Sequence, residues 1–290
     1  MIRHPRIADE CVCCGSSDLC SHPAVLMPFV ANRVFGWEPV EITPDWHLRD
    51  VNCGWAYPLC RTLSCRQCGL VFLDIRFDDA EIAALYRGYR DAAYVAQRVR
   101  FEPDYQARND DLVVGHGYVR DIERFLRARI GEVASVLDWG GDTGINTPFR
   151  GHLAVHDVYD ISEKPVVDGA RRIRSADEVE SEYDLIVLSQ VLEHVPFPAD
   201  TVAEVVRVLG PNTALWVEVP YEDVIREAAD PSRAYLEKMH WHEHVNFFTE
   251  DALARLLGGQ GLAVQDKLVL PVEVARRRAC ILGVLCGRSS

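Results

Sequence analysis

The chain has 290 residues, of which 48% are hydrophobic and 26% charged, a composition typical of a folded globular protein. Its 44 acidic and 31 basic residues give a net charge of −13, which disfavours nucleic acid as a partner because such a surface repels phosphate backbones. No apolar run resembles a signal peptide or could span a bilayer, so we expect a cytoplasmic protein without a membrane partner.

The first quarter of the chain holds eight of the ten cysteines. Because no export signal precedes them, this clustering favours metal binding over disulfides. Two C-x-x-C-G knuckles stand out, and the two-residue spacing lets both thiolates of a knuckle reach one ion. A closed structural zinc site is therefore predicted from Cys11, Cys14, Cys65 and Cys68. Further ligands, or a second site, could come from Cys13, Cys20, Cys53 and Cys60.

Three regions follow one another along the chain. Residues 1–77 form the cysteine-rich module, rich in proline and tryptophan, with an insertion over 15–64 between the knuckles. Residues 78–130 show three-and-four apolar spacing that predicts two bridging helices, one containing Leu85 and Tyr86 and one containing Ile122 and Phe125. From residue 131 to 290, apolar strands alternate with amphipathic helices, which indicates a mostly parallel, doubly wound α/β sheet.

The strands and helices of this last region can be placed from the sequence. Strands are expected at 133–137, 154–159, 185–188 and 214–219, and a glycine-rich turn after the first of them should open a helix. Helices are expected at 199–209 and after the capping residue Thr249. The final apolar runs, 262–270 and 279–285, should pair as antiparallel strands that close the sheet.

The turn after the first of these strands is the most informative segment. The strand ends in Asp138, and the following glycines allow the backbone to pass close to a ligand. Asp160 ends the second strand, where an acid accepts hydrogen bonds from ribose hydroxyls in nucleotide-binding sheets. A nicotinamide dinucleotide site is the alternative, but Asp142 and Asn146 replace the second and third glycines of that fingerprint, and Asp142 would repel a pyrophosphate.

Together with the segment Tyr183–Val195, these residues resemble class I S-adenosylmethionine-dependent methyltransferases. The resemblance covers about residues 131–290 and implies a seven-stranded sheet whose last strand is antiparallel. It implies that cofactor is bound by Asp138, Gly140, Gly141, Asp142, Gly144, Asp160, Ser189 and Gln190. The family usually has glycine in place of Asp142, which would either pair with the cationic end of the cofactor or weaken its binding.

The order of the cysteine module followed by Leu85, Tyr86 and Tyr89 resembles the zinc-binding front end of deoxysugar C-methyltransferases. Their Tyr-His-Glu-His segment is matched by residues 241–244, with Trp241 in place of the tyrosine. The resemblance implies that the last histidine, His244, is the general base.

The catalytic candidates are therefore His244, His194 and Glu243. His240, His242 and His244 alternate and could instead share a face and bind a metal, or serve as structural hydrogen-bonding groups. The expected reaction is O-, N- or C-methylation of a sugar, a sugar nucleotide or a related small metabolite. Two other classes remain open, an inactive binding or scaffold protein on the same fold and a nicotinamide-dependent oxidoreductase.

Overall fold

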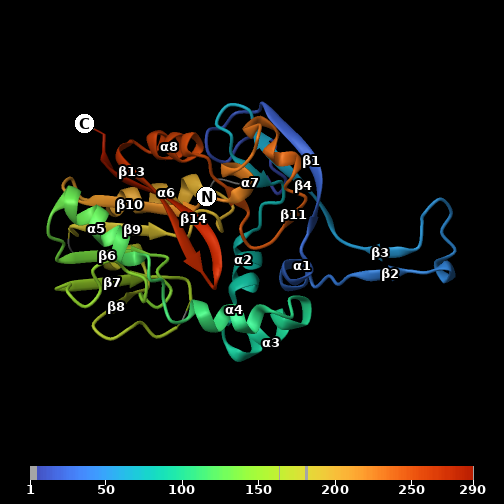
Figure 1. The fold of residues 1–290 in the computed structure, drawn as a ribbon, viewed down its shortest axis with the longest axis horizontal. Coiled ribbons are helices and arrows are strands. Elements are labelled where there is room, and N and C mark those ends of the chain that lie inside the picture. The colour runs from blue at the N-terminus through green and yellow to red at the C-terminus, as the bar shows by residue number, and fades with distance from the viewer. Residues whose placement is uncertain (1–4, 163, 180–181, 290) are drawn as a thin grey trace.

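The computed structural model describes residues 5–162, 164–179 and 182–289. Within these residues the strands form a seven-stranded sheet, a five-stranded sheet and a two-stranded ribbon (Figure 1). No helix in the described ranges is both long and apolar enough to cross a membrane.

The seven-stranded sheet has the order β13-β14-β10-β9-β6-β7-β8. Its strands are β6 (Ser135–Trp139), β7 (Val155–Tyr159), β8 (Arg171–Ile173), β9 (Leu185–Ser189), β10 (Ala214–Pro220), β13 (Leu262–Val274) and β14 (Arg277–Arg288). Every pairing is parallel except those of β14, which is antiparallel to both β10 and β13. The predicted mostly parallel sheet with antiparallel C-terminal strands is therefore confirmed. Chain order reverses between β6 and β9, and such a reversal opens a ligand crevice at the carboxyl ends of the strands.

Helices cover both faces of this sheet. On one face lies α5 (Val119–Ile130), whose Phe125 ring packs 5.5 Å from that of Trp216 on β10. The other face packs against α6 (Pro198–Val208) and α8 (Glu250–Gly259). Thr249 caps α8 as predicted, since its side chain accepts a hydrogen bond from the backbone N–H of Ala252.

The helix expected directly after β6 does not form. Residues 140–152 make consecutive turns instead, with backbone bonds such as the one from Gly144 N to Gly141 O at 2.8 Å. The physical reason is the backbone conformation, because positive φ angles at Gly140, Asp142, Gly144, Phe149 and Gly151 interrupt any right-handed helix. The glycine-rich turn is consequently a looped segment without a helix N-terminus.

The five-stranded sheet has the order β11-β1-β4-β5-β12. From the N-terminal region come β1 (Leu19–Leu26), β4 (Leu59–Cys65) and β5 (Val71–Leu73). The two edge strands, β11 (His240–Trp241) and β12 (Asn246–Phe247), come from nearly 170 residues later. Residues 1–77 therefore do not complete this sheet by themselves. The segment 240–244, called the histidine segment below, begins in one edge strand and leads to the other.

Four helices, rather than two, form within residues 78–130. The two predicted ones correspond to α2 (Asp79–Tyr86) and α5, and between them lie α3 (Ala92–Phe101) and α4 (Tyr105–Leu112). Asp78 and Asp91 each cap the helix that follows, so the chain restarts a helix at each of these points. Two further short α-helices lie elsewhere in the described residues, α1 (Pro28–Phe35) and α7 (Asp223–Arg226).

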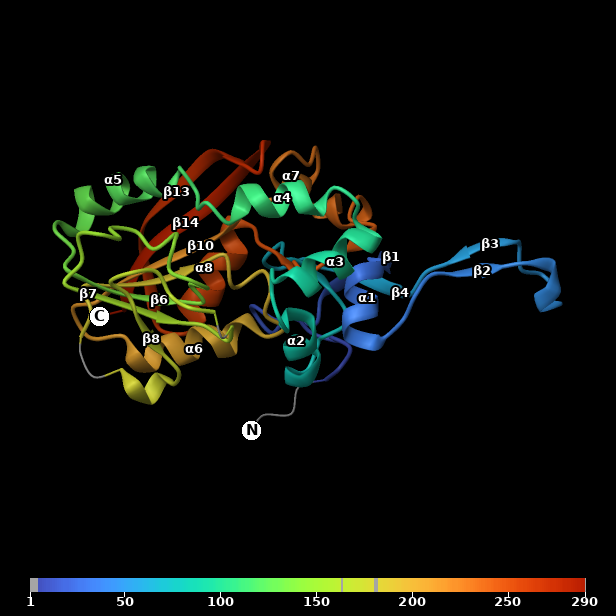
Figure 2. The same cartoon turned by 90° about the horizontal axis from the view of Figure 1, so that it is seen from below.

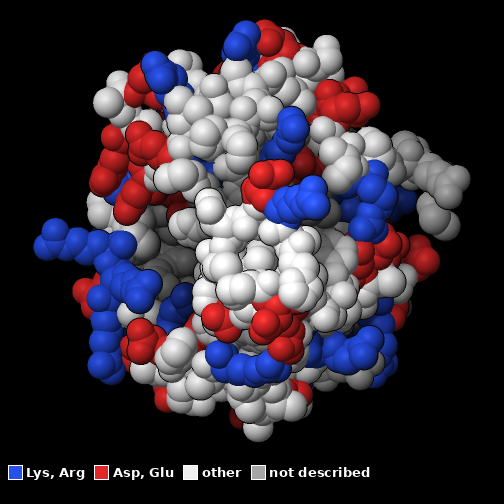
Figure 3. Space-filling model, turned by 90° about the vertical axis from the view of Figure 1, so that its right-hand side faces the viewer, with Lys and Arg blue, Asp and Glu red and all other residues white. Residues whose placement is uncertain are grey.

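Part of the predicted insertion forms an arm. The strands β2 (Val40–Ile42) and β3 (Gly54–Ala56) pair as an antiparallel ribbon that projects away from the body in both ribbon views (Figures 1 and 2). Figure 3 views the molecule from the side toward which the arm projects, where positive and negative side chains are interspersed around an uncharged central area. That face therefore carries no extended patch of positive or of negative side chains.

Candidate active site

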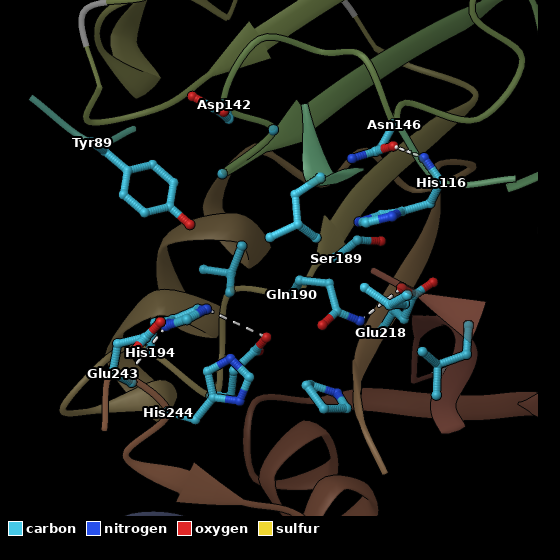
Figure 4. Close-up of a pocket in the computed structure, with 18 of the residues that line it drawn as sticks. Tyr89, His116, Asp142, Asn146, Ser189, Gln190, His194, Glu218, Glu243 and His244 are labelled. Atoms are coloured by element: carbon cyan, nitrogen blue, oxygen red, sulfur yellow. Dashed lines mark hydrogen bonds and ion pairs between the residues drawn. The ribbon is translucent and has the colours of Figure 1, made fainter. Parts of the chain in front are cut away.

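A cavity of about 1030 Å³ opens at the carboxyl ends of β6, β7, β9 and β10. Its lining includes all of the predicted cofactor and catalytic residues except Gly144. In Figure 4, Asp142 lies at one end of the pocket and His194 and His244 lie at the other, with Ser189 and Gln190 between them. The volume is at the upper end for small-molecule sites, so it can hold a cofactor and a second molecule.

The glycines of the turn are required by close approaches. A Cβ atom on Gly140 would lie 2.4 Å from Cγ2 of Val191, and one on Gly141 would lie 2.5 Å from the carboxyl group of Asp138. Gly144 instead packs behind the turn against Val158. The turn therefore packs closely on Asp138, Val158 and Val191, and a side chain at any of these glycines would prevent that packing.

Asp138, at the end of β6, is buried beneath this turn. Its Oδ2 accepts a hydrogen bond from the hydroxyl of Thr147 at 2.5 Å, and that hydroxyl also contacts Nε2 of His156 at 2.9 Å. Burial raises the pKa of Asp138 to about 7, although the bond from Thr147 acts in the opposite direction. The Asp138 carboxyl group at the end of β6 is therefore protonated more easily than an ordinary aspartate.

Asp160, at the end of β7, organises the neighbouring loop. Its carboxylate accepts backbone hydrogen bonds from Asp142 at 2.9 Å and from Ser162 at 2.6 Å. Asp142 has φ of 52° and forms an ion pair with Lys164, the Nζ–Oδ2 distance being 3.0 Å. The charge of Asp142 is thus compensated from within the chain.

Gln190 follows β9 with a φ of 57°, a conformation uncommon for residues other than glycine. Its Nε2 donates to Oε1 of Glu218 on β10 at 2.9 Å, and its backbone N–H donates to the carbonyl of the same residue. Glu218 is buried and also accepts from the hydroxyl of Tyr118 at 3.1 Å. Burial raises the pKa of Glu218 despite these bonds.

His194, in the segment after β9, is held through one ring nitrogen. Nδ1 lies 2.8 Å from the hydroxyl of Tyr86 and 3.1 Å from the backbone carbonyl of Glu243. Burial, reinforced by the neighbouring charge of His244, lowers the pKa of His194 to about 3. This imidazole therefore stays neutral near neutral pH.

His244 has a different environment. Its ring lies 4.6 Å from that of His194, and its Nδ1 lies 3.1 Å from Oε1 of Glu222. Burial alone would lower the pKa of His244, but the bond to Glu222 and the nearby charge of Glu193 outweigh burial, so the pKa is raised. The two rings are therefore in contact, but the pKa of His194 is lowered and the pKa of His244 is raised.

Two glutamates accompany them. Glu193 has 1% of its surface exposed, and burial raises the pKa of its carboxyl group to about 8. Glu243 forms an ion pair with the buried Arg98, the Nη2–Oε1 distance being 2.7 Å. Burial would raise the pKa of Glu243, but the charge of Arg98, followed by those of His242 and His244, lowers it well below its usual value.

A buried polar cluster positions these segments. The guanidinium of Arg76, just after β5, donates to the side-chain oxygen of Asn246 and to the carbonyls of Pro196 and Val245. Asn246 in turn donates to the carbonyls of Leu192 and Val195. The segment after β9 and the histidine segment are therefore fastened together by the five-stranded sheet.

The structure brings together the four predicted metal-binding cysteines. The Sγ–Sγ distances are 3.6 Å between Cys11 and Cys68 and 3.6 Å between Cys14 and Cys65. Tetrahedral zinc with bonds of about 2.3 Å places its sulfur ligands about 3.8 Å apart, so the cluster fits this ion. No other cysteine belongs to the cluster within the described ranges. Thr249, the cap of α8, donates to the carbonyl of Cys68 at 2.7 Å and joins the cluster to the large sheet's helices.

Several site residues were not predicted from the sequence. Four charged side chains that contact predicted residues come from segments that showed no motif. They are Lys164, Glu218, Glu222 and Arg98. The clearest available signal was the lone glutamate in the strand at 214–219, since a charge within an apolar strand needs a partner. The other contacts form only through tertiary packing.

Comparisons with known proteins agree with this arrangement. A family model described as "Methyltransferase domain" matches residues 104–267, more than half of the chain. No curated protein matches the chain.

Two solved structures are similar to the chain at low sequence identity. A 1,6-didemethyltoxoflavin-N1-methyltransferase from Burkholderia thailandensis, with bound S-adenosylhomocysteine, is 20% identical and has a TM-score of 0.48; the match covers 68% of this chain and 89% of that one. An N-methyltransferase from Bradyrhizobium japonicum is 15% identical with a TM-score of 0.44, covering 65% and 97% of the two chains.

Proposed function

The chain belongs to the methyltransferase domain family as an S-adenosylmethionine-dependent enzyme, and we propose that it methylates a sugar, a sugar nucleotide or a related small metabolite. The observation that carries this proposal is the division of one cavity into two ends. The glycine turn and Asp160 lie at one end, and a histidine–glutamate cluster lies at the other.

The first end fits the cofactor. Gly140 and Gly141 line the cavity and pack too closely on Val191 and Asp138 to carry side chains, and Asp160 follows the second strand. We assign cofactor contacts to Asp138, Gly140, Gly141, Asp160, Ser189 and Gln190. Asp142 holds Lys164, and Gly144 supports the turn from behind. When bound, S-adenosylmethionine supplies an electrophilic methyl group on its sulfonium sulfur.

The second end fits a methyl acceptor that must lose a proton. A carboxylate only accepts hydrogen bonds, so the contact with Glu222 places the proton of His244 on Nδ1 and leaves Nε2 able to take another. His194, with a pKa of about 3, is the weaker base, so we assign to it and to Glu243 the orientation of the cluster. The deoxysugar C-methyltransferase resemblance supports the same assignment for His244.

The substrate class is supported by charges in the cavity. Arg277 and Arg278, at the start of β14, line the cavity together with Arg90 and Arg108, although the lining also includes many acidic side chains and Arg108 is paired with Glu102. Guanidinium groups bind phosphates well because their donors match phosphate geometry. These arginines favour a phosphorylated acceptor such as a nucleotide-linked sugar.

We further propose that the cysteine cluster holds a structural zinc ion. Gly15 and Gly69 have φ angles of 70° and 76° and each closes a knuckle by donating to the first cysteine's carbonyl. A closed set of four thiolates suits structure rather than catalysis. Its purpose would be to secure the five-stranded sheet, whose edges carry the histidine segment.

The direct test is calorimetric titration of the zinc-loaded protein with S-adenosylmethionine and S-adenosylhomocysteine, followed by transfer of labelled methyl groups to a panel of sugars and nucleotide sugars. We expect micromolar binding of both cofactor forms and methylation of at least one nucleotide sugar. Absence of cofactor binding to folded protein would favour an inactive scaffold. Cofactor binding with methylation of unrelated acceptors only would overturn the substrate class.

A further inference from the structure

A second cluster of metal-binding side chains lies at the histidine end of the cavity, apart from the four cysteines. One carboxylate oxygen of Glu193 and one ring nitrogen each of His194 and His244 all lie within 4.8 Å of one another. The closest measured approach is 3.6 Å, between Oε1 of Glu193 and Nε2 of His194. These three side chains come from two segments that the Arg76–Asn246 cluster fastens together.

The hydrogen bonds around the cluster determine which atoms face one another. Nδ1 of His194 contacts the carbonyl oxygen of Glu243, and Nδ1 of His244 contacts the carboxylate of Glu222. Glu222 can only accept, so Nδ1 of His244 carries the proton and its Nε2 is left with a lone pair. Nδ1 of His194 also lies 2.8 Å from the hydroxyl of Tyr86, and Nε2 of His194 has a free lone pair in the tautomer that donates from Nδ1 to the carbonyl of Glu243. In that tautomer, one ring nitrogen of each histidine and the carboxyl group of Glu193 lie close enough together to bind one ion.

The burial of Glu193 and its lack of hydrogen-bond partners within the described ranges also favour a bound ion. Its side chain is almost completely buried, and neither carboxylate oxygen has a hydrogen-bond partner among the described residues. A buried carboxyl group whose two oxygens have no hydrogen-bond partner is left unsatisfied. A bound cation would coordinate the carboxylate of Glu193 and both imidazoles at the same time.

We propose that Glu193, His194 and His244 bind a divalent first-row transition metal ion, with open coordination positions facing the cavity. Two histidines and one carboxylate form a ligand set that suits such ions and leaves room for another molecule. Metal–ligand bonds of about 2.0–2.2 Å place ligand atoms about 3–3.5 Å apart, so only small side-chain rotations are needed.

The surroundings already have the pattern found around metal-bound histidines. Such histidines donate their other ring N–H to a carboxylate or a backbone carbonyl, which holds the ring in place and increases its basicity. Glu222 serves His244 in this way, and the carbonyl of Glu243 serves His194. Glu222 is therefore a positioning residue of the metal site, although it is not a ligand.

The metal site stands on this geometry alone, but its role rests on the proposed function. In the methyltransferase, the open positions would hold an oxygen of the methyl acceptor and increase the acidity of its hydroxyl group, whose proton would pass to solvent as the methyl group is transferred. His244 would then be a ligand whenever the ion is bound, which replaces the direct base role assigned above.

The test is titration of the full chain, with zinc already in the cysteine cluster, using Co²⁺ alone as the probe. We expect one equivalent of Co²⁺ to bind and to give weak visible bands without the intense near-ultraviolet absorption of cobalt–thiolate bonds. Glu193→Gln and His244→Asn should each weaken Co²⁺ binding more than 100-fold, and Glu222→Gln should weaken it about 10–100-fold through its effect on His244.

The matched control is His240→Gln, which removes a cavity-lining histidine outside the cluster and should leave Co²⁺ affinity unchanged. Circular dichroism of each variant verifies folding. The proposal is overturned if the zinc-loaded protein binds no Co²⁺, or if Glu193→Gln and His244→Asn bind it as tightly as the unchanged chain. Titration of the same proteins with S-adenosylhomocysteine keeps the two proposals separate, because cofactor binding does not need these residues.

Discussion

Nη1 of Arg76 donates a hydrogen bond to the side-chain oxygen of Asn246 over 2.9 Å, between two residues that are 170 positions apart and both buried. The bond connects the end of β5 with β12 and thus holds the histidine segment against the segment after β9. Because the same guanidinium also serves the carbonyls of Pro196 and Val245, one side chain supports both halves of the histidine end of the cavity.

Replacing Arg76 with methionine should therefore destabilise the protein strongly. The change leaves several buried oxygens without a donor, and each such group costs about 1–3 kcal/mol. We expect a loss of roughly 3 kcal/mol or more in the free energy of unfolding, measured by urea denaturation. Arg124→Met, at a side chain with 78% of its surface exposed, is the control and should change stability by less than about 0.5 kcal/mol. A comparable effect at both positions would contradict the role of Arg76.

Asp160→Ala should weaken cofactor binding while the protein stays folded. Hydrogen bonds to a charged group contribute about 1.5–3 kcal/mol, so we expect the dissociation constant for S-adenosylhomocysteine to rise roughly 10- to 100-fold. Calorimetry measures this constant, with the exposed Asp168→Ala as a control. Unchanged affinity in Asp160→Ala would remove Asp160 from the cofactor site.

Asp142→Gly tests whether the unusual acid in the turn contacts the cofactor. Its φ of 52° suits glycine, and its charge is already paired with Lys164. We therefore expect the affinity for S-adenosylmethionine, measured by calorimetry, to change less than about threefold, which is under 1 kcal/mol. A loss above tenfold would mean instead that Asp142 pairs with the cationic end of the cofactor.

The raised pKa of Asp138, about 7, predicts a specific pH dependence of stability. Between about pH 4, where an unfolded aspartate titrates, and pH 7, the native state binds the proton more tightly than the unfolded state. The contribution of Asp138 to stability therefore falls as the pH rises through this window. Asp138→Asn lacks this titration, so its stability relative to the unchanged chain should rise by a few kcal/mol from pH 4 to pH 7.5.

Urea denaturation at several pH values measures this difference for the cofactor-free protein. The matched control, Asp168→Asn, alters an exposed carboxyl group and should show a flat difference across the same range. A flat difference for Asp138→Asn as well would show that the Asp138 carboxyl group titrates normally.

Changing Cys65 and Cys68 to serine should release the structural zinc. We expect about one zinc per chain to disappear by elemental analysis, with a lower melting temperature, because four thiolates are needed to close the site. The measurement is made with Glu193→Gln in both the parent and the altered protein, so that the Glu193 cluster cannot retain the ion. Zinc that remains stoichiometric after the double change would rule out the cysteine site.

The sequence led to the turn and the strand-end acids that we propose bind the cofactor, because the information for these elements is local. Apolar runs ending in Asp138 and Tyr159–Asp160 specify parallel strands with acids at their carboxyl ends, and the glycines between them specify a close backbone approach. The knuckles at Cys11 and Cys65 are local in the same sense, since each is set by a two-residue spacing and a glycine. The turns after β6 were mispredicted as a helix because positive φ at Asp142 and Phe149 depends on packing, not on residue type.

The histidine end could not be predicted in the same way. Its groups come from separate segments, with Tyr86 and Arg98 from the bridging helices, Glu193 and His194 from the segment after β9, and Glu222 and His244 from beyond β10. No spacing in the chain relates these positions, because long-range strand pairing at β11 and β12 brings them together. The pattern of residues alone thus specified the sheet, the cofactor turn and the cysteine knuckles, through short-range periodicity and turn chemistry. Tertiary packing decided which buried charges face one another, because only burial and a fixed backbone determine the partner of each carboxylate and imidazole.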